Sequence, residues 1–417
     1  MGNIRYKGGN YTKDTRSSYV QVEPLSVTAN GTYTAESGKA YNPVSVNVEP
    51  PQPVSENDVT FYDYDGTVVY SYTAAEFAEL EYMPANPTHA GLTSQGWNWS
   101  FSDAKQYVSD YGKLNIGQMY ITDDGKTRLV IQLEEGRLSP TLGLRLNGTA
   151  TIDWGDGSEP SMVTTQYPTG IYKTHTYSYV GKYIIKISID GSANIVSATS
   201  SSEICTKGSV AYVRENYIYL NCLKAIYIGN NIGISTCAFT NCYSLAQITI
   251  PKNITSIGSS AFKFCYALKH IILPNTVTSI SDNAFESCMS LKKILMPNSI
   301  SSIGLYVFQY CYTLPEIIIP KSVNLIAAYT FMANYSLSCI SIPDTVTGIA
   351  GNVFPNCYGL GFIKFTSTTP PTVANSNAWS GVPTDCKILV PQGTLETYKA
   401  AQNYPNPNTY TYEEYTE

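Results

Sequence analysis

The chain has 417 residues, a formal net charge of −6 and only 14% charged residues. It carries no basic stripe that would bind phosphates, which excludes a nucleic-acid partner, and no apolar run of about 18 residues, which excludes membrane insertion by a helix. Tyrosine is abundant, with 35 copies. Two interpretations of this stay open: a Tyr-rich recognition surface, or a β-rich protein that carries Tyr on its strands.

The first residues, Met1 to Lys7, are polar and lack the apolar core of a signal peptide, so we expect no export signal. Residues 20–54 are predicted to form a small β module, with a turn at Asn30-Gly31 and a strand at Val44–Val48. A proline-rich linker follows at Pro50–Pro53. The string "NGTYTA…GKAY.PVSVNV" resembles a short module of tail-associated prophage proteins from gut bacteria.

Residues 55–127 are predicted to form an α+β module. "VTFYDYDGTVVYSY" indicates a hairpin that turns at Asp65-Gly66. Thr73 and Glu76 form a capping box that opens a helix through Leu80. This segment too resembles prophage proteins.

A second helix in this module is expected at Asp103–Asp110, with Ser102 as its cap and Gly112 as its stop. Trp97 and Trp99 are expected in the core.

Residues 128–198 contain "ATIDWGDGSEP" and "KTHTYSYVGKYIIKISI". These strings resemble the Trp-Gly-Asp-Gly turn and the paired strands of a PKD-type β-sandwich, a family of spacer and presentation domains. Asp153 and Asp156 suit either a calcium ion or hydrogen bonds that close the turn, and the second interpretation is favoured. No metal or other cofactor is otherwise expected.

Self-similarity at a fixed period dominates the rest of the chain. Four apolar positions recur every 23 residues: a phenylalanine, an isoleucine before it, and a leucine and an isoleucine after it. The phenylalanines are Phe239, Phe262, Phe285, Phe308, Phe331 and Phe354. In each unit a short strand such as Leu245–Ile250 points alternate side chains inward, and "AFTNC" is predicted to form a helical turn. "IGSSAFKFCYALKHIILP" at Ile257–Pro274 resembles the BspA-like leucine-rich repeat, which implies a stacked solenoid.

Five of the ten cysteines occupy one position of the repeat, namely Cys242, Cys265, Cys288, Cys311 and Cys357, and Asn334 takes the sixth. We expect buried free thiols that pack coil on coil, in a reducing compartment.

The phase of the strands predicts an outward aliphatic stripe of Ile272, Leu295 and Ile318. The polar residues beside it are His270, Lys293 and Glu316. An exposed stripe of this kind indicates a partner. Two interpretations stay open: the stripe binds a partner, or a flanking loop or neighbouring subunit covers it.

A further column follows the cysteines and contains Tyr243, Tyr266, Tyr312, Tyr335 and Tyr358, with Met289 in the third place. These rings either form a ladder that binds sugars or a protein surface, or lie half-buried against the next coil. The second interpretation is favoured.

The sequence therefore predicts a multidomain, β-rich protein with a C-terminal leucine-rich-repeat solenoid. Its expected segments are an N-terminal attachment arm at 1–19, the small β module at 20–54, the α+β module at 55–127, the PKD-like sandwich at 128–198, the solenoid at 199–385, and a closing strand, helix and tail at 386–417.

No motif of a known catalytic centre occurs, so we expect a binding protein and not an enzyme. The prophage resemblances imply a phage or prophage tail-fibre or receptor-binding protein, assembled in the bacterial cytoplasm and carried on the virion. Its N-terminal modules would dock to other tail or baseplate proteins, and its solenoid would bind a host-surface protein or glycan. The alternatives are a bacterial cell-surface BspA-like adhesin and a structural tail or baseplate spacer. A trimer is left open.

Overall fold

The computed structural model describes residues 26–27, 33–34, 58–165, 170–195 and 222–416. The chain divides into two compact units, Met1–Glu56 and Asn57–Glu417. Of the first unit, only β1 (Ser26–Val27) and β2 (Tyr33–Thr34) are described, and they pair antiparallel. The remaining expectations for residues 1–57 lie outside the described residues.

The α+β module, residues 58–126, is a four-stranded sheet in the order β4-β3-β6-β5 that carries two helices. Its elements are β3 (Val59–Tyr62), β4 (Val68–Tyr72), α1 (Ala74–Glu79), β5 (Leu92–Trp97), α2 (Phe101–Tyr111) and β6 (Leu114–Thr122). The hairpin and the Thr73–Glu76 capping box are confirmed. Trp97 and Trp99 are buried, as expected. Helix α2 begins earlier than predicted because its cap is Ser100, whose hydroxyl accepts from the backbone N–H of Asp103.

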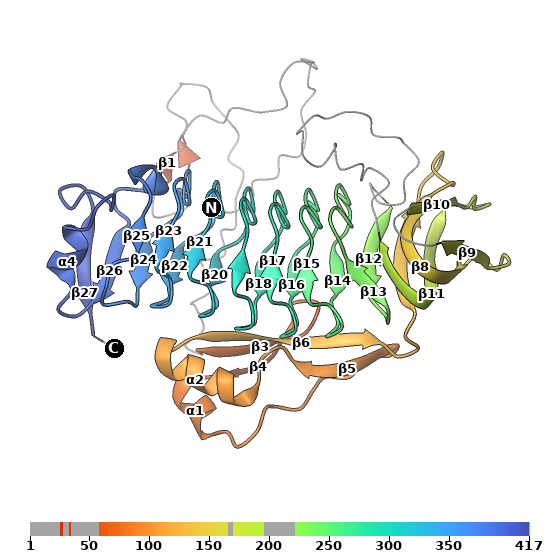
Figure 1. Cartoon of the computed structure of the whole chain (residues 1–417), viewed down its shortest axis with the longest axis horizontal. Coiled ribbons are helices and arrows are strands. Elements are labelled where there is room, and N and C mark those ends of the chain that lie inside the picture. Colours follow the sequence, from red (N-terminus) through yellow and green to blue (C-terminus); the bar gives the residue numbers. More distant parts are fainter. Residues whose placement is uncertain (1–25, 28–32, 35–57, 166–169, 196–221, 417) are drawn as a thin grey trace, which may run out of the picture. The chain divides into compact units, whose positions relative to one another are not determined.

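The next five strands are β7 (Thr127–Leu133), β8 (Thr141–Asp153), β9 (Ser161–Thr165), β10 (Gly170–Thr174) and β11 (Gly181–Ile195). They do not close on themselves as a separate sandwich. Strand β7 pairs antiparallel with the first strand of the solenoid, so one sheet continues from these strands into the repeats. The hydrophobic core is likewise continuous from Leu129 to Tyr412. These strands therefore close the N-terminal end of the coil stack (Figure 1).

The solenoid has two columns of short parallel strands (Figure 1). The first column contains β12 (Leu223–Tyr227), β14 (Gln247–Thr249), β16 (His270–Ile272), β18 (Lys293–Leu295), β20 (Glu316–Ile318), β22 (Cys339–Ile342), β24 (Phe362–Phe365) and β26 (Lys387–Pro391). The second contains β13 (Ile232–Ile234), β15 (Ser256–Ile257), β17 (Ser279–Ile280), β19 (Ser302–Ile303), β21 (Leu325–Ile326), β23 (Gly348–Ile349) and β25 (Thr372–Val373).

Between the two columns each coil makes a tight turn around its phenylalanine, not the helical turn that the sequence predicts. The residues two places before and after Phe262, Ser260 and Phe264, both have positive φ, at 54° and 63°. The backbone N–H groups of the turn alternate between two kinds of bond. Phe262 donates to the carbonyl of Ala284 in the next coil at 2.8 Å, whereas Cys265 donates to Phe262 within its own coil at 3.1 Å, so no continuous helix forms. The six phenylalanine rings stack in one row, with successive centroids 5.3 to 6.0 Å apart.

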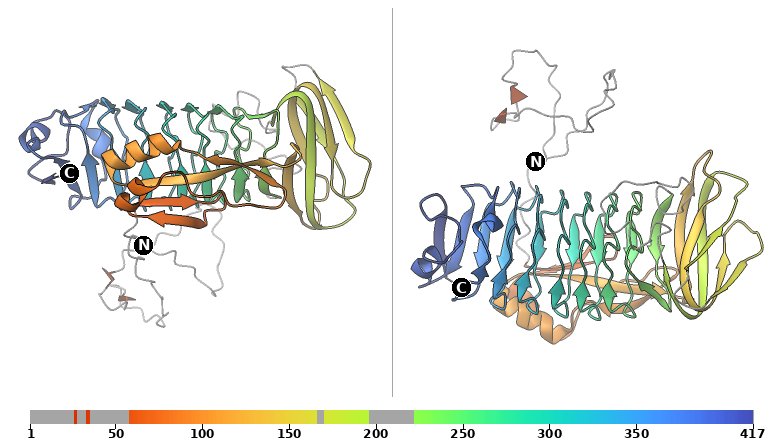
Figure 2. Two further views of the ribbon diagram at one scale, coloured as in Figure 1. Left: turned by 90° about the horizontal axis from the view of Figure 1, so that it is seen from below. Right: turned by 45° about the horizontal axis from the view of Figure 1, so that its top comes forward.

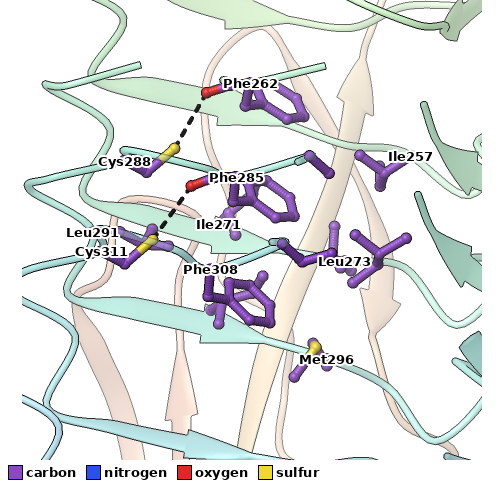
Figure 3. Packing of buried hydrophobic residues seen from close by; sticks show 14 of the residues in the cluster. Ile257, Phe262, Ile271, Leu273, Phe285, Cys288, Leu291, Met296, Phe308 and Cys311 are labelled. Atoms are coloured by element: carbon purple, nitrogen blue, oxygen red, sulfur yellow. Dashed lines mark hydrogen bonds between the residues drawn. The ribbon is translucent and has the colours of Figure 1, made fainter. Parts of the chain in front are cut away.

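The cysteine column lies beside this row, and its members are buried with free thiols. The Sγ of Cys288 donates to the carbonyl of Phe262 at 3.3 Å, and Cys311 does the same to Phe285 (Figure 3). Burial raises the pKa of both thiols, so they stay protonated. Cys237, outside this column, is disulfide-bonded, which departs from the expected reduced state.

The C-terminal end is closed by a 3-10 turn at Ser376–Trp379, the helix α4 (Leu395–Lys399) and a final strand β27 (Thr411–Tyr415). Trp379 stacks on Phe354 and ends the aromatic row. The expected closing strand and helix are both present as β26 and α4. The tail adds β27, which pairs parallel with β26 as the outermost strand of this sheet.

Asn334, which takes the cysteine position in its coil, gives a stability prediction. Its Nδ2 donates to the carbonyls of Phe308 and Phe331, both at 2.8 Å, but its buried Oδ1 has no hydrogen-bond partner. Because an orphaned buried acceptor costs about 1–3 kcal/mol, we expect Asn334→Cys to raise the free energy of unfolding by about 1 kcal/mol. Chemical denaturation measures this. The reciprocal change Cys311→Asn should lower stability, and a destabilising Asn334→Cys would contradict the interpretation.

Candidate functional site

The strand face is the outward side of β14, β16, β18 and β20, where the sequence predicts an exposed aliphatic stripe. That expectation is wrong, because the α+β module lies across this face (Figure 1, Figure 2). Strand β6 crosses β14, β16 and β18. Ile272 is 7% exposed and Leu295 is 3% exposed, and Ile318 packs against the core of the module. Of the two interpretations left open by the sequence, the structure supports a cover, and the cover belongs to the same chain.

The close approach of β6 depends on a residue without a side chain. A Cβ on Gly117 would lie 2.5 Å from the Cγ2 of Ile272, so the strand reaches the stripe only because this position is glycine. Met119 and Tyr62 pack around Ile272 and Leu295. The buried Asn98 ties the two parts together: its Oδ1 accepts from the backbone N–H of Gly117, and its Nδ2 donates to the carbonyl of Leu273 at 3.2 Å.

Two of the polar residues predicted to bind a partner contact the α+β module instead. Lys113 reaches Glu316 at 2.6 Å, and Asn115 donates to the same carboxylate. Lys293 lies 3.5 Å from Glu316 and donates to the hydroxyl of Tyr62. Burial alone would raise the pKa of Glu316, but the two lysines outweigh it and the net pKa is lowered. These charges form a network that fixes the position of the module.

His270, the third predicted polar residue, is also enclosed. A Cβ on Gly66 would lie 2.5 Å from its ring, and its Nδ1 is buried without a hydrogen-bond partner. Burial lowers the pKa of His270, and Lys292 and Lys293 lower it further. The imidazole therefore sits neutral between the module and the coils.

A short connection holds the module in place. Only the turn 123–126 separates β6 from β7. Gly125 accepts from the backbone N–H of Asn230, and Arg128 donates to the carbonyl of Gly91 and to Asp123. Such a connection gives the docked module a high effective concentration at the strand face.

The tyrosine column stands on a different part of each coil from the strand face. It forms the tyrosine ladder, consisting of Tyr243, Tyr266, Tyr312, Tyr335 and Tyr358. Tyr312 and Tyr335 stack with centroids 4.8 Å apart and ring planes 2° apart, and Tyr335 and Tyr358 stack at 5.8 Å and 17°. Tyr243 and Tyr266 form a second stacked pair at 5.0 Å. Met289 interrupts the ladder between the two runs.

Three members of the ladder are well exposed: Tyr266 at 37%, Tyr335 at 45% and Tyr358 at 58%. Tyr243 and Tyr312 are half-buried. Both interpretations of this column thus hold in part, since the rings pack on the next coil and still reach the surface. Of the predicted site residues, these tyrosines are brought together at the surface, whereas the strand-face residues are brought together under the module.

Residues 232–361 match the family described as "BspA type Leucine rich repeat region", in six copies. This match lies within the solenoid. The match does not extend to residues 128–198, for which a PKD-type domain is expected, or to the N-terminal segments that resemble prophage proteins.

Among solved structures, the chain is similar to a leucine-rich repeat protein of T. pallidum, with 26% identity, a TM-score of 0.33, and coverage of 39% of this chain and 84% of that one. A leucine-rich repeat protein from Bacteroides ovatus is 24% identical, with a TM-score of 0.33 and coverage of 45% of this chain and 54% of that one. A search of curated proteins found no match.

The Trp-Gly-Asp-Gly turn in the strands before the solenoid uses both of its carboxylates. Asp153 accepts from the backbone N–H of Gly155, and Asp156 accepts from Ser158 and lies 2.7 Å from the Nε2 of His175. Partial burial opposes ionisation of Asp156, but these hydrogen bonds outweigh it and hold its pKa at about 2. Within the described ranges, no group of three or more acidic, His or Cys side chains is arranged to hold a metal ion.

No helix in the described part of the chain is long and apolar enough to cross a membrane.

The burial of the strand face predicts which substitutions unfold the protein. Leu295→Asp places an unpaired charge between β6 and the coils, so we expect the free energy of unfolding to fall by about 3 kcal/mol or more. Leu325→Asp is the matched control, because Leu325 is 52% exposed on the other strand column; its effect should stay within about 0.5 kcal/mol. Equal stability of the two variants would show that the strand face is open in solution.

Proposed function

We propose that this protein is a bacterial cell-surface binding protein, an adhesin, whose BspA-type solenoid contacts its partner through the tyrosine ladder. The observation that carries this proposal is a row of stacked, surface-exposed tyrosines on consecutive coils. Tyrosine offers a large amphipathic contact area and loses little conformational entropy when it is ordered, so it is frequent at recognition surfaces. We propose no catalytic role and no cofactor.

The choice of the ladder over the strand face follows from burial. A partner that bound Ile272 or Leu295 would first have to displace β6 and break the charge network of Lys113, Glu316 and Lys293. The ladder needs no such rearrangement, since Tyr335 and Tyr358 are already exposed. Binding at a preformed surface avoids the free-energy cost of opening the molecule.

One observation supports the cell surface as the location. The repeats match the BspA-type family, and the sequence already offered a surface adhesin of that type as an alternative.

A phage or prophage receptor-binding protein is the second candidate. It is favoured by the resemblance of residues 20–54 and 55–127 to tail-associated prophage proteins. In that setting the N-terminal modules would dock to tail or baseplate proteins, as a trimer or otherwise, and the solenoid would meet the host surface. The structural spacer has no observation of its own in its favour.

The location is tested with an antibody against the solenoid, applied to intact cells of the producing bacterium and to particles purified after prophage induction. We expect staining of intact cells that external protease removes. Signal only in tail-bearing particles would contradict the adhesin and support the phage protein.

The binding surface is tested by removing the rings. We expect the triple change Tyr312→Thr, Tyr335→Thr and Tyr358→Thr to lower binding of the labelled full chain to epithelial cells at least tenfold, because it deletes three surface rings of the kind that dominate interfaces. The control is Tyr82→Thr with Tyr179→Thr, two residues that are both 76% exposed and lie outside the ladder. Equal binding by the two variants would rule out the ladder as the contact surface.

A further inference from the structure

His270 of β16 lies in the contact between the α+β module and the coils. A Cβ on Gly66, in the turn of the β3–β4 hairpin, would come within 2.5 Å of its ring, so the glycine backbone lies directly on the imidazole. The Nδ1 of His270 is buried and has no hydrogen-bond partner in the protein. The ring is thus enclosed by a part of the chain that belongs to the module and not to the solenoid.

Charged and titratable groups face this ring from each element that packs on it. Those of the coils are three lysines, Lys269, Lys292 and Lys293. Those of the hairpin are Tyr62, Asp63 and Asp65. The carboxylate of Asp63 lies 2.6 Å from the Nε2 of His89, so Asp65 is the carboxylate that favours a charged His270.

The docked module favours the neutral form of the ring. Burial is the largest effect that lowers the pKa of His270, and it outweighs the opposing attraction of Asp65. The three lysines belong to the solenoid, so they repel a charged ring whether or not the module is docked.

The sign of the pH dependence follows from this balance. When the module leaves, water reaches the ring and the pKa of His270 rises toward its ordinary value. The released state therefore binds a proton more tightly than the docked state, and acid shifts the equilibrium toward release. Docking is fully stabilised above the ordinary pKa of histidine, about 6.5, and weakens as the pH falls below it.

The module is built so that it can leave without unfolding. It has a core of its own, which contains Phe61, Phe77, Trp97 and Ile116, and only the turn 123–126 joins β6 to β7. Its contact with the coils is also incompletely hydrogen-bonded. In the described part of the chain, four buried side-chain atoms of β6 and the strands that it crosses have no hydrogen-bond partner: Gln118 Oε1, Thr122 Oγ1, Thr249 Oγ1 and His270 Nδ1. Such atoms weaken a contact, because water satisfies them on release.

We propose that the α+β module is an acid-released cover of the strand face, with His270 as the group that senses the pH. At neutral pH the imidazole is uncharged and the module lies across the coils. As the pH falls below about 6.5, protonation of His270 raises the fraction of molecules in which the module has left the coils. Release exposes Ile272 and Leu295, which are buried in the docked state, while the turn 123–126 keeps the module attached. This property is independent of what the tyrosine ladder binds.

One backbone amide reports release directly. The N–H of Lys252 in the solenoid donates to the Oε1 of Gln95 in the module at 2.8 Å, so hydrogen exchange at Lys252 requires the module to move. The N–H of Leu273 donates to the carbonyl of Leu295 within the solenoid at 3.0 Å and is the internal control. Exchange at both amides of the full chain is measured by mass spectrometry with single-residue resolution, at about pH 7.5 and about pH 5.5, on either side of the ordinary histidine pKa. The rates are corrected for the intrinsic pH dependence of amide exchange.

We expect the corrected exchange at Lys252 to rise at the lower pH, by up to about tenfold per pH unit for one linked proton, while exchange at Leu273 stays unchanged. His270→Gln should remove the rise, because an amide side chain takes up no proton. His89→Gln is the matched control and should keep it. Asp65→Asn should enlarge the rise, since the charged ring then loses its carboxylate in the docked state.

Any of four results would overturn the proposal: no rise at Lys252 in the wild-type chain, the same rise in His270→Gln, loss of the rise in His89→Gln, or an equal rise at Leu273. The last result would mean that acid unfolds the solenoid as a whole.

Discussion

The inward apolar side chains of each coil are buried against the coils before and after it, and the rest of the structure depends on this constraint. A side chain at a fixed position in the coil meets its own counterpart about one strand spacing away. The same rule puts Phe262 on Phe285 in the core and Tyr312 on Tyr335 at the surface. The core and the candidate binding surface are thus two columns of one repeat, and the geometry that stabilises the first determines what the second can bind.

The strand face shows what happens when a column is apolar on the outside. Ile272 and Leu295 would expose an apolar stripe, and the chain covers it with β6 of the α+β module. Gly117 permits the contact, and Glu316, held by Lys113 and Lys293, fixes its position. A stripe that resembles a binding site in sequence is here an internal interface, and we propose the ladder as the recognition surface in its place.

The repeat was predictable from the sequence because its signal is local and periodic. Phe239 and its five counterparts recur every 23 residues, and a short strand needs only neighbouring residues to define its inward side. The backbone conformation of the turn around each phenylalanine was not predictable from the sequence. Its positive φ values depend on hydrogen bonds to the next coil, such as the one between Phe262 and Ala284. The sheet shared by β7 and the solenoid likewise depends on pairing between distant segments.

The candidate site was predictable in its composition but not in its exposure. Phasing the strands predicted that Ile272 and Leu295 share one column, and the two residues do lie in register on adjacent strands. Nothing in that phase says that residues 114–122 lie across it, because contacts such as Asn98 with Leu273 join positions 175 apart in the chain. For the tyrosine column the sequence offered surface exposure and packing on the next coil as alternatives. In the structure the rings do both, because stacked rings can still reach the surface.

The central claim is that the strand face stays covered while the ladder binds, and the direct test is to lock the module in place. Asp110 of α2 and Lys321 of the solenoid form an ion pair across the contact, so cysteines at these two positions can be joined by a short bis-maleimide crosslinker. Binding of the locked protein to epithelial cells should equal that of the same variant without crosslinker. Loss of binding on locking would show that the module must leave the strand face and would contradict the account.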